Sequence, residues 1–399
     1  MKFSMSTFPT KFAGKKPEPN IAILVFPFAA PNVFDFSYKT VSVFSSVAGR
    51  IYFISGGIPR HFKWPENVEV HDIGIRLHYL NARQPAWLSA VLWLCKALFA
   101  QILMGLKLIR LSREIDMVYC AMGVYYQFPI LLAKLLGKRI LTAALGDYSR
   151  KAKMNYGNFI ALLTGYLARF NYNFSDGIIV ESFRLAGCKD LLPYSSKLLD
   201  GALFLENPVS YRNNRPVDER QDLVGFIGRF VAEKGILDFL DAIPLILDKN
   251  PGVQFLIVGA GILDAQVGKI LSDAPWAERV TRLAWVDHAE IPGYLGSLKL
   301  LVVPSYDEGL PNLILEAMGC GTPVLASTAG GIPDLISHHN TGFVLESICP
   351  QEIAAAVLAA LRCPSLPEIS RNAMVHIEQN YTFAAARRRF RAILDELLP

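Results

Sequence analysis

Charged side chains are scarce in this sequence. Only 19% of its 399 residues are Asp, Glu, Lys or Arg, and 52% are hydrophobic. This composition excludes a disordered chain and favours buried parallel strands or contact with a membrane. The formal net charge is only +5, and the charges are scattered. So weak a charge argues against nucleic acid as a partner, although it suits an anionic ligand or membrane face.

Clusters of cysteine or histidine are also lacking. The six cysteines contain no CxxC pair, which predicts reduced core residues in a cytoplasmic protein; they are Cys95, Cys120, Cys188, Cys320, Cys349 and Cys363. Of the seven histidines, only His338 and His339 are adjacent, and neighbours cannot both face one ligand from a regular element. We therefore expect no metal site. A secretory cleavage pattern is lacking too, and residues 1–19 are expected to form a flexible segment.

Short apolar runs in the first half predict buried strands at 20–26, 50–55, 115–121, 139–145 and 176–182. A helix is expected at 127–136, whereas residues 68–80 read as a less regular stretch. Alternation of strands and helices predicts a doubly wound parallel sheet, in which ligands bind beyond the carboxyl ends of the strands.

Three residues in this half are candidates for the acceptor side of a site. Gly123 follows one predicted strand, and Asp147 follows the next. Asp147 can orient a hydroxyl group or cap the following helix. Arg150 belongs to a basic stretch that is either a solvated face or a site for an anionic acceptor or lipid headgroup.

Residues 86–111 form the most apolar region and allow three interpretations. A helix of this length can cross a bilayer, but Lys96 and Gln101 would then lie near its middle, at a cost of a few kcal/mol for the charge. The other two interpretations are a helix lying on a membrane surface and a core helix of the first domain.

The chain is longer than one hydrophobic core usually requires, so two domains are expected. The predicted first domain covers 20–210, a polar linker covers 211–221, and the second domain covers 222–375. Strands of the second domain are expected at 223–228, 253–258, 279–284, 298–303 and 323–326, and residues 376–399 are expected to be a terminal segment with a helix from 383 to 398.

Charged residues in the second half follow predicted strands. Arg229 and Lys234 come just after the first of them, where two fixed cations suit a diphosphate. Glu308 and Glu316 are separated by seven residues and lie on either side of a helix start near Pro311. Such a helix start is an anion site, and both carboxylates can face a ligand placed over it. Alternatively, the two glutamates are solvated surface residues.

Glycines add two indications. Gly259-Ala-Gly261 invites a dinucleotide interpretation, but Asp264 stands where the third glycine of that fingerprint should fall, which argues against an oxidoreductase. The pair Gly330-Gly331 follows another predicted strand, and it lets the backbone approach a ligand closely.

Taken in order, these motifs resemble a known family. Gly228-Arg229, Glu233-Lys234-Gly235, the two glutamates within residues 304–324 and the GGIPDLI segment are similar to the nucleotide-sugar domain of retaining glycosyltransferases of family 4. The resemblance implies the GT-B fold, with two Rossmann-like domains facing a cleft and a terminal helix returning to the first. It also implies sugar transfer from a nucleotide-diphosphate donor to an acceptor hydroxyl, without a cofactor or metal.

The resemblance implies roles for individual residues. Arg229 and Lys234 would hold the donor diphosphate and stabilise the leaving group, Glu308 would contact the sugar and Glu316 the ribose. Trp285 and Asp287 would lie near the base. The remaining donor-binding residues would be Gly228, Gly309, Leu310, Asn312, Leu313, Gly330 and Gly331. The expected acceptor is a sugar, a glycan or a lipid-linked molecule, and the expected location is the cytoplasm, at the inner face of the membrane.

Two departures from the family pattern stand in the first domain. Residues 26–31 (FPFAAP) replace a glycine pair that many relatives carry after the first strand. Leu145 or Gly146 stands where relatives usually have a histidine near the donor sugar, and Asp147 is a partial substitute. The absent histidine keeps a non-catalytic nucleotide-sugar binder open as a function, and a nucleotide-sugar epimerase on the same fold is a further alternative.

Overall fold

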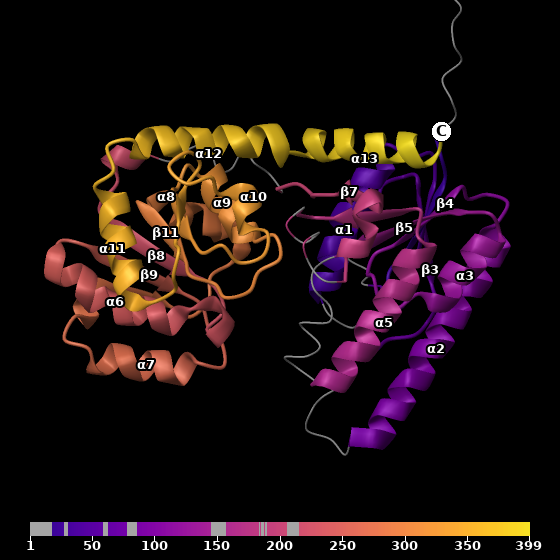
Figure 1. The fold of residues 1–399 in the computed structure, drawn as a ribbon, viewed down its shortest axis with the longest axis horizontal. Coiled ribbons are helices and arrows are strands. Elements are labelled where there is room, and N and C mark those ends of the chain that lie inside the picture. Colours follow the sequence, from indigo (N-terminus) through magenta and orange to yellow (C-terminus); the bar gives the residue numbers. More distant parts are fainter. Residues whose placement is uncertain are drawn as a thin grey trace, which may run out of the picture.

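The structure of the chain is a computed structural model, which describes residues 18–27, 31–58, 63–77, 86–144, 157–182, 184, 187, 190–205 and 215–399. Its strands form two parallel sheets, one in each of two lobes (Figure 1). Helices cover both faces of each sheet. The predicted α/β fold with two doubly wound domains is therefore confirmed.

The first sheet has, within the described residues, the strand order β3-β2-β1-β4-β5-β6-β7, and every pair is parallel. The strands are β1 (Ile21–Leu24), β2 (Ile51–Ser55), β3 (Val68–Asp72), β4 (Met117–Cys120), β5 (Arg139–Ala144), β6 (Gly177–Val180) and β7 (Leu198–Asp200). The helices of this lobe are α1 (Pro31–Ser45), α2 (Ala86–Leu111), α3 (Gln127–Leu135) and α5 (Asn158–Phe174).

The two faces of this sheet are both buried. Ile21 and Ile23 of β1 pack with side chains of α1 and the C-terminal helix, whereas Ala22 and Leu24 pack with α2 and α3. Strands covered on both faces are continuous apolar runs, which is why the central ones were predicted from the sequence. The edge strand β3 (VEVHD) is half-exposed and carries charge, so the expectation of a less regular stretch was wrong there.

The second sheet repeats the pattern, with the order β10-β9-β8-β11-β12-β13. Its strands are β8 (Leu223–Ile227), β9 (Gln254–Val258), β10 (Val280–Leu283), β11 (Leu300–Val303), β12 (Val324–Ala326) and β13 (Phe343–Val344). Its helices are α6 (Ile236–Lys249), α7 (Asp264–Asp273), α8 (Ile291–Ser297), α9 (Asn312–Gly319), α10 (Ile332–Leu335), α11 (Pro350–Leu361) and α12 (Leu366–Asn380).

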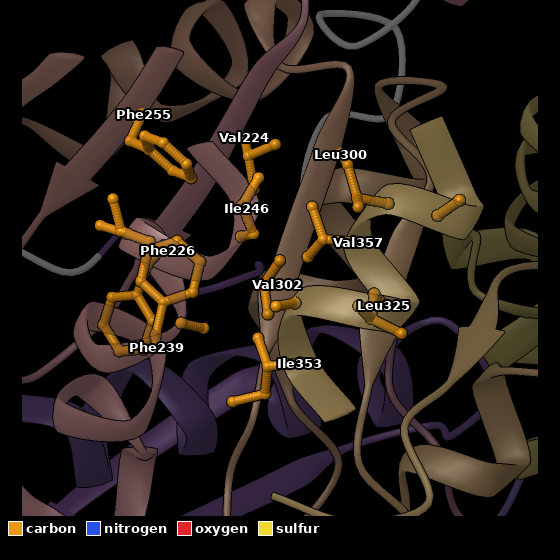
Figure 2. Close-up of a cluster of buried hydrophobic side chains, with 14 of the residues drawn as sticks. Val224, Phe226, Phe239, Ile246, Phe255, Leu300, Val302, Leu325, Ile353 and Val357 are labelled. Carbon is orange, nitrogen blue, oxygen red and sulfur yellow. The ribbon is translucent and has the colours of Figure 1, made fainter. Parts of the chain in front are cut away.

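Aromatic packing fixes α6 against the second sheet. The ring of Phe239 on α6 lies 5.7 Å from that of Phe226 on β8 and 6.2 Å from that of Phe255 on β9 (Figure 2). Val302 of β11 and Ile353 of α11 belong to the same buried cluster. The loop between β8 and α6, which carries Arg229 and Lys234, is thus held at both ends by the core.

The last two helices run along both lobes (Figure 1). Ala373 and Ile377 of α12 belong to a core cluster of the second lobe, whereas Phe390 and Ile393 of α13 (Phe383–Leu397) belong to one of the first. The predicted domain end at residue 375 lies inside α12, which continues unbroken to Asn380 because its apolar residues keep packing on the second lobe.

The end of the predicted linker belongs to the second lobe. Val217 is buried in that core, and the Arg220 guanidinium, also buried, donates to Leu298 O (2.8 Å), Cys320 O (3.1 Å) and Thr322 Oγ1 (2.8 Å). Burial lowers the pKa of Arg220. The linker prediction was wrong here. The sequence alone does not distinguish a solvated arginine from a buried one that donates to carbonyl groups at helix ends.

The environment of α2 narrows the three interpretations given for residues 86–111. By length and composition, residues Leu92–Leu111 could cross a membrane, but a third of this stretch is buried within the protein. Met104 and Leu108 pack with the first sheet, and the buried Gln101 side chain accepts from Phe128 N at 3.1 Å, at the start of α3. Cys95, on the same helix, is exposed, so the expectation that the cysteines are core residues was wrong there; it is confirmed for Cys120 and Cys320, whereas Cys349 and Cys363 are half-buried and Cys188 lies outside the described residues.

We predict that Arg220→Ala destabilises the second lobe by about 2–4 kcal/mol, because it leaves buried carbonyl groups without their charged donor. Urea denaturation of the whole protein, followed by tryptophan fluorescence and circular dichroism, measures the change. Arg215→Ala is the matched control, since its side chain is exposed. Equal stability of the two variants would contradict this account of Arg220.

Candidate active site

The candidate site lies at the point where the strand order of the second sheet reverses. β8 and β11 are neighbours there, although they are far apart in sequence. Gly228 and Arg229 follow β8, and Ser305 and Glu308 follow β11. The two loops are joined directly, because Tyr306 N donates to Glu233 O at 2.8 Å. Doubly wound sheets bind ligands at such a reversal, beyond the carboxyl ends of the strands.

A cavity of about 350 Å³ opens between these loops. Its walls combine the apolar ends of β8 and β11, charged side chains from both loops and the first residues of α9. The lining residues are Phe226, Ile227, Gly228, Arg229, Lys234, Val302, Val303, Ser305, Glu308, Leu310, Pro311, Asn312 and Leu313. Many of the residues singled out in the sequence therefore line one concave site, which is the usual form of a small-molecule site.

Lys234 and Glu308 form an ion pair inside this cavity. Lys234 Nζ lies 2.6 Å from Glu308 Oε1, and the two side chains are only 21% and 11% exposed. Ser305 Oγ donates to the same carboxylate oxygen at 2.8 Å. Ser327 Oγ in turn donates to Ser305 O at 2.6 Å. The carboxylate is thereby held in one orientation before any ligand binds.

Arg229 is the second cation of the site and is less constrained. Its guanidinium lies 2.8 Å from Glu233 Oε1, but the Arg229 side chain is 68% exposed. An ion pair this exposed contributes little to stability. The guanidinium can therefore leave Glu233 for an incoming anion without a large penalty.

The start of α9 supplies backbone donors. No side chain caps this helix at Pro311, and its first residues, Asn312 and Leu313, line the cavity. The first amide groups of a helix have no intrahelical acceptor and carry partial positive charge. An anionic group in the cavity would meet these amides as well as the two cations.

The glycine pair after β12 contacts the site loop itself. Gly330 has a φ of +53°, and a Cβ atom there would lie 1.9 Å from Glu308 O. Gly331 N donates to Gly309 O at 2.8 Å. The pair therefore holds the backbone of the Glu308 loop in place, and its close approach to a ligand stays a prediction.

Glu316 lies apart from the cavity lining. It is buried on α9, and its Oε1 is 3.4 Å from Nε2 of the exposed His288.

Nearby on the Glu308 loop, burial and the Asp238 carboxylate raise the pKa of Tyr306, so this phenol stays a neutral donor at physiological pH. Among the described residues, no group of three or more His, Cys, Asp or Glu side chains could hold a metal ion.

A polar contact between the lobes lies beside the glycine pair. Ser182, after β6, donates to Asp334 on α10, and Arg184 Nε is 3.9 Å from the same carboxyl group. A Cβ atom at Gly331 would lie 2.9 Å from Ser182 Cβ. Sequence reasoning missed Ser182, Ser305 and Ser327, because isolated serines carry no pattern that marks them.

The candidates of the first lobe are only partly located. Gly123 follows β4 beside the reversal of the first sheet, and its carbonyl oxygen accepts from Asn171 Nδ2 at 2.9 Å. Asp147 and Arg150 lie outside the described residues. After β1, where many relatives carry a glycine pair, this chain has Phe26. Its backbone N donates to Tyr126 Oη at 2.8 Å, and the Phe26 ring stacks on the ring of Tyr125.

Comparison with known proteins shows that part of this chain is similar to one family. Residues 221–363 match the family model described as Glycosyl transferases group 1. Alpha-D-kanosaminyltransferase of Streptomyces kanamyceticus is 30% identical over 187 residues, which are 47% of this chain and 48% of that protein. The amylovoran biosynthesis glycosyltransferase AmsK of Erwinia amylovora is 28% identical over 33% of this chain and 34% of its own. The chain thus spans about half, or less, of the length of these curated relatives.

Solved structures extend the similarity to both lobes. HepE of Anabaena, crystallised with UDP, superposes with a TM-score of 0.70 over 95% of this chain and 100% of its own, at 16% identity. Sucrose-phosphate synthase of Thermosynechococcus elongatus gives a TM-score of 0.69 over 95% and 99%, also at 16% identity. At such identities the likeness concerns the fold alone. The chain therefore has the GT-B fold, and its residues 221–363 are similar to the glycosyl transferases group 1 family.

Proposed function

We propose that this protein is a retaining glycosyltransferase that moves a sugar from a nucleotide-diphosphate donor to an acceptor hydroxyl. The observation that carries the proposal is the convergence of Arg229, Lys234, Glu308 and the start of α9 on one cavity. Two cations and a set of free helix amides at the end of a parallel sheet suit a diphosphate. A fixed carboxylate beside them suits the hydroxyl groups of a sugar.

The cations provide the main chemical assistance. When the bond between the anomeric carbon and the diphosphate breaks, negative charge grows on the leaving phosphate oxygens. Lys234 and Arg229 would stabilise that charge in place of a metal ion, and the amides of Asn312 and Leu313 would add to it. Because the apolar ends of β8 and β11 form part of the wall, these charges would act where water is partly excluded.

Glu308 is assigned to the sugar and Glu316 to the ribose. Glu308 already has one oxygen in hydrogen bonds with Ser305 and Lys234, so its orientation would be set when a sugar hydroxyl arrives. The buried Glu316 would reach a ribose near the exposed His288. Retention of the anomeric configuration rests on the family resemblance, as does the absence of a metal or cofactor.

The acceptor is assigned to the first lobe. Relatives are named for amylovoran and capsular polysaccharide biosynthesis, which supports a role in cell-surface polysaccharide synthesis; glycolipid synthesis and a cytoplasmic location are further parts of the proposal. A lipid-linked sugar would suit the apolar first lobe. Gly123, beside the reversal of the first sheet, lies at the position where that lobe would meet a ligand.

A non-catalytic nucleotide-sugar binder is the second candidate. It is favoured by Leu145 and Gly146, which stand where relatives usually have a histidine near the donor sugar. An epimerase on the same fold would form product from the donor alone. A thermal-shift screen of nucleotide sugars identifies the donor, and incubation with and without acceptor sugars then separates the three functions.

We predict that Lys234→Ala and Glu308→Ala each reduce transfer at least about 100-fold, because each removes a preorganised charge from the reacting centre. The two variants should differ in nucleotide binding. Lys234→Ala should weaken binding of the nucleoside diphosphate, whereas Glu308→Ala should retain it, since Glu308 is assigned to the sugar. Calorimetry with the nucleoside diphosphate of the active donor measures this difference.

Lys249→Ala and Glu278→Ala are matched controls on the surface of the same lobe, and both should keep wild-type rates. Transfer within tenfold of wild type in both site variants would overturn the site assignment. Nuclear magnetic resonance of the first-formed product reports the anomeric configuration, and inversion would exclude the retaining mechanism.

Ser305 is predicted to be a positioning residue for Glu308. It is buried, and Ser305→Ala removes its hydrogen bond to Glu308 Oε1 without removing either charge. We expect the turnover number to fall about tenfold, as one hydrogen bond to a charged group implies. Binding of the nucleoside diphosphate should stay unchanged, and Ser305→Thr should restore part of the rate. Ser297→Ala, at an exposed serine, is the control; an equal loss in that variant would remove the role given to Ser305.

A further inference from the structure

Three helices of the first lobe carry a broad apolar face that the described residues do not cover. α3 contacts both α2 and α5, so the three form one layer. The large apolar side chains exposed on this layer are Leu92, Leu94, Leu98, Phe99, Ile102, Leu106 and Ile109 on α2, Phe128, Leu131 and Leu135 on α3, and Ile160, Leu162, Leu163 and Tyr166 on α5. Leu135 is 85% exposed and Leu162 is 75% exposed. Exposed apolar area gathered in this way marks a surface for interaction.

The uncovered face is distinct from the core face of the same helices. On α2, Ala97, Met104 and Leu108 pack against the first sheet, while Phe99, Ile102 and Leu106 point outward. The helix is therefore an integral part of the lobe and keeps that packing only if it stays on the sheet. This packing argues against a bilayer-spanning α2 in the described fold, and it leaves its outer face for a partner.

The charge of this layer identifies the partner. α2, α3 and α5 contain no Asp or Glu, but they contain Lys96, Lys107, Arg110, Lys134 and Arg169. Lys134 and Arg169 are paired with Asp176 and Asp190 of neighbouring segments. Lys96 and Arg110 are exposed beside the apolar residues of α2. A face whose helices are apolar and cationic and contribute no carboxylate is complementary to a bilayer that carries anionic lipids.

We infer that the α2-α3-α5 face docks on the surface of an anionic phospholipid bilayer. The apolar side chains would enter the boundary between headgroups and acyl chains, and the lysine and arginine side chains would reach the phosphates. Figure 1 shows α2 along the edge of the first lobe that lies away from the second lobe. A membrane on this side would leave the donor cavity free to face the solvent.

The test is flotation of the full-length protein with vesicles. Vesicles of phosphatidylcholine alone are compared with vesicles that also contain phosphatidylglycerol. We expect the wild-type protein to float with the anionic vesicles and to be released by high salt in part only, because salt screens the cationic contribution but not the apolar one. Leu135→Glu and Leu162→Glu should each lower binding about tenfold, since each places a carboxylate at the contact.

Val375→Glu is the matched control, because it makes the same charge change on an exposed helix position of the second lobe. Lys96→Glu tests the cationic contribution and should weaken binding to anionic vesicles only. All substituted side chains are exposed, so the melting temperature and nucleotide binding of each variant should match those of the wild type. The assay needs no sugar transfer, so its outcome is separate from that of the proposed function.

Three outcomes would overturn the inference. The first is wild-type protein that stays unbound with both kinds of vesicle. The second is binding that Leu135→Glu and Leu162→Glu leave unchanged. The third is a concentration-dependent dimer in sedimentation that these two substitutions abolish, since it would assign the face to a second copy of the chain.

Discussion

The pairing of β8 with β11 is the constraint on which the candidate site depends. The register places Val224 opposite Leu300, so two segments about 75 residues apart end at the same edge of the sheet. Close contacts enforce this arrangement. A Cβ atom at Gly225 would lie 2.3 Å from Leu298 Cδ1, and one at Gly235 would lie 2.1 Å from Pro304 O. Bringing these backbones together is what places Lys234 within reach of Glu308.

The charges of the cavity are balanced before a ligand arrives. Lys234 is paired with Glu308, and Arg229 with Glu233. A bound diphosphate would have to replace the two carboxylates as the partners of these cations. The free energy of this exchange differs between the two pairs. The exposed Arg229 pair is screened by water, whereas the Lys234 pair is nearly enclosed and shares its carboxylate with Ser305. We expect Lys234 to retain its place and Arg229 to move, so the ligand would be met by one fixed cation and one mobile cation.

Much of the fold was predictable from sequence because both sheets are buried on both faces. Strands such as β4 and β11 are apolar throughout, and the glycines and charges that follow them mark the carboxyl ends where a ligand binds. The ordered set of motifs led to the cavity residues Arg229, Lys234 and Glu308. The half-exposed edge strand β3 lacked such a signal, and its charged residues resembled those of a loop.

What sequence could not provide was the partner of each polar side chain. Arg220 reads as part of a linker until the carbonyl groups it satisfies are seen, and Ser305 reads as an ordinary loop residue until its bond to Glu308 is seen. The partners of Arg220 lie on segments that are distant in the chain, and the bond from Ser305 to Glu308 is set by the local geometry of the loop. Residue spacing encodes neither of these contacts. The same limit applied to residues 86–111, whose composition suits a core, a surface or a span.

The two lobes differ in where their charged and apolar side chains lie. In the second lobe, the sheet edge gathers charges around a small cavity, and its apolar residues are largely enclosed in two cores. In the first lobe, apolar side chains of α2 and α5 remain on the outside although the inner faces of the same helices are fully packed. Excess outer apolar area adds nothing to the stability of the isolated lobe and raises the tendency to aggregate. Its presence on three adjacent helices without a carboxylate is therefore best explained by a surface that the lobe meets in use.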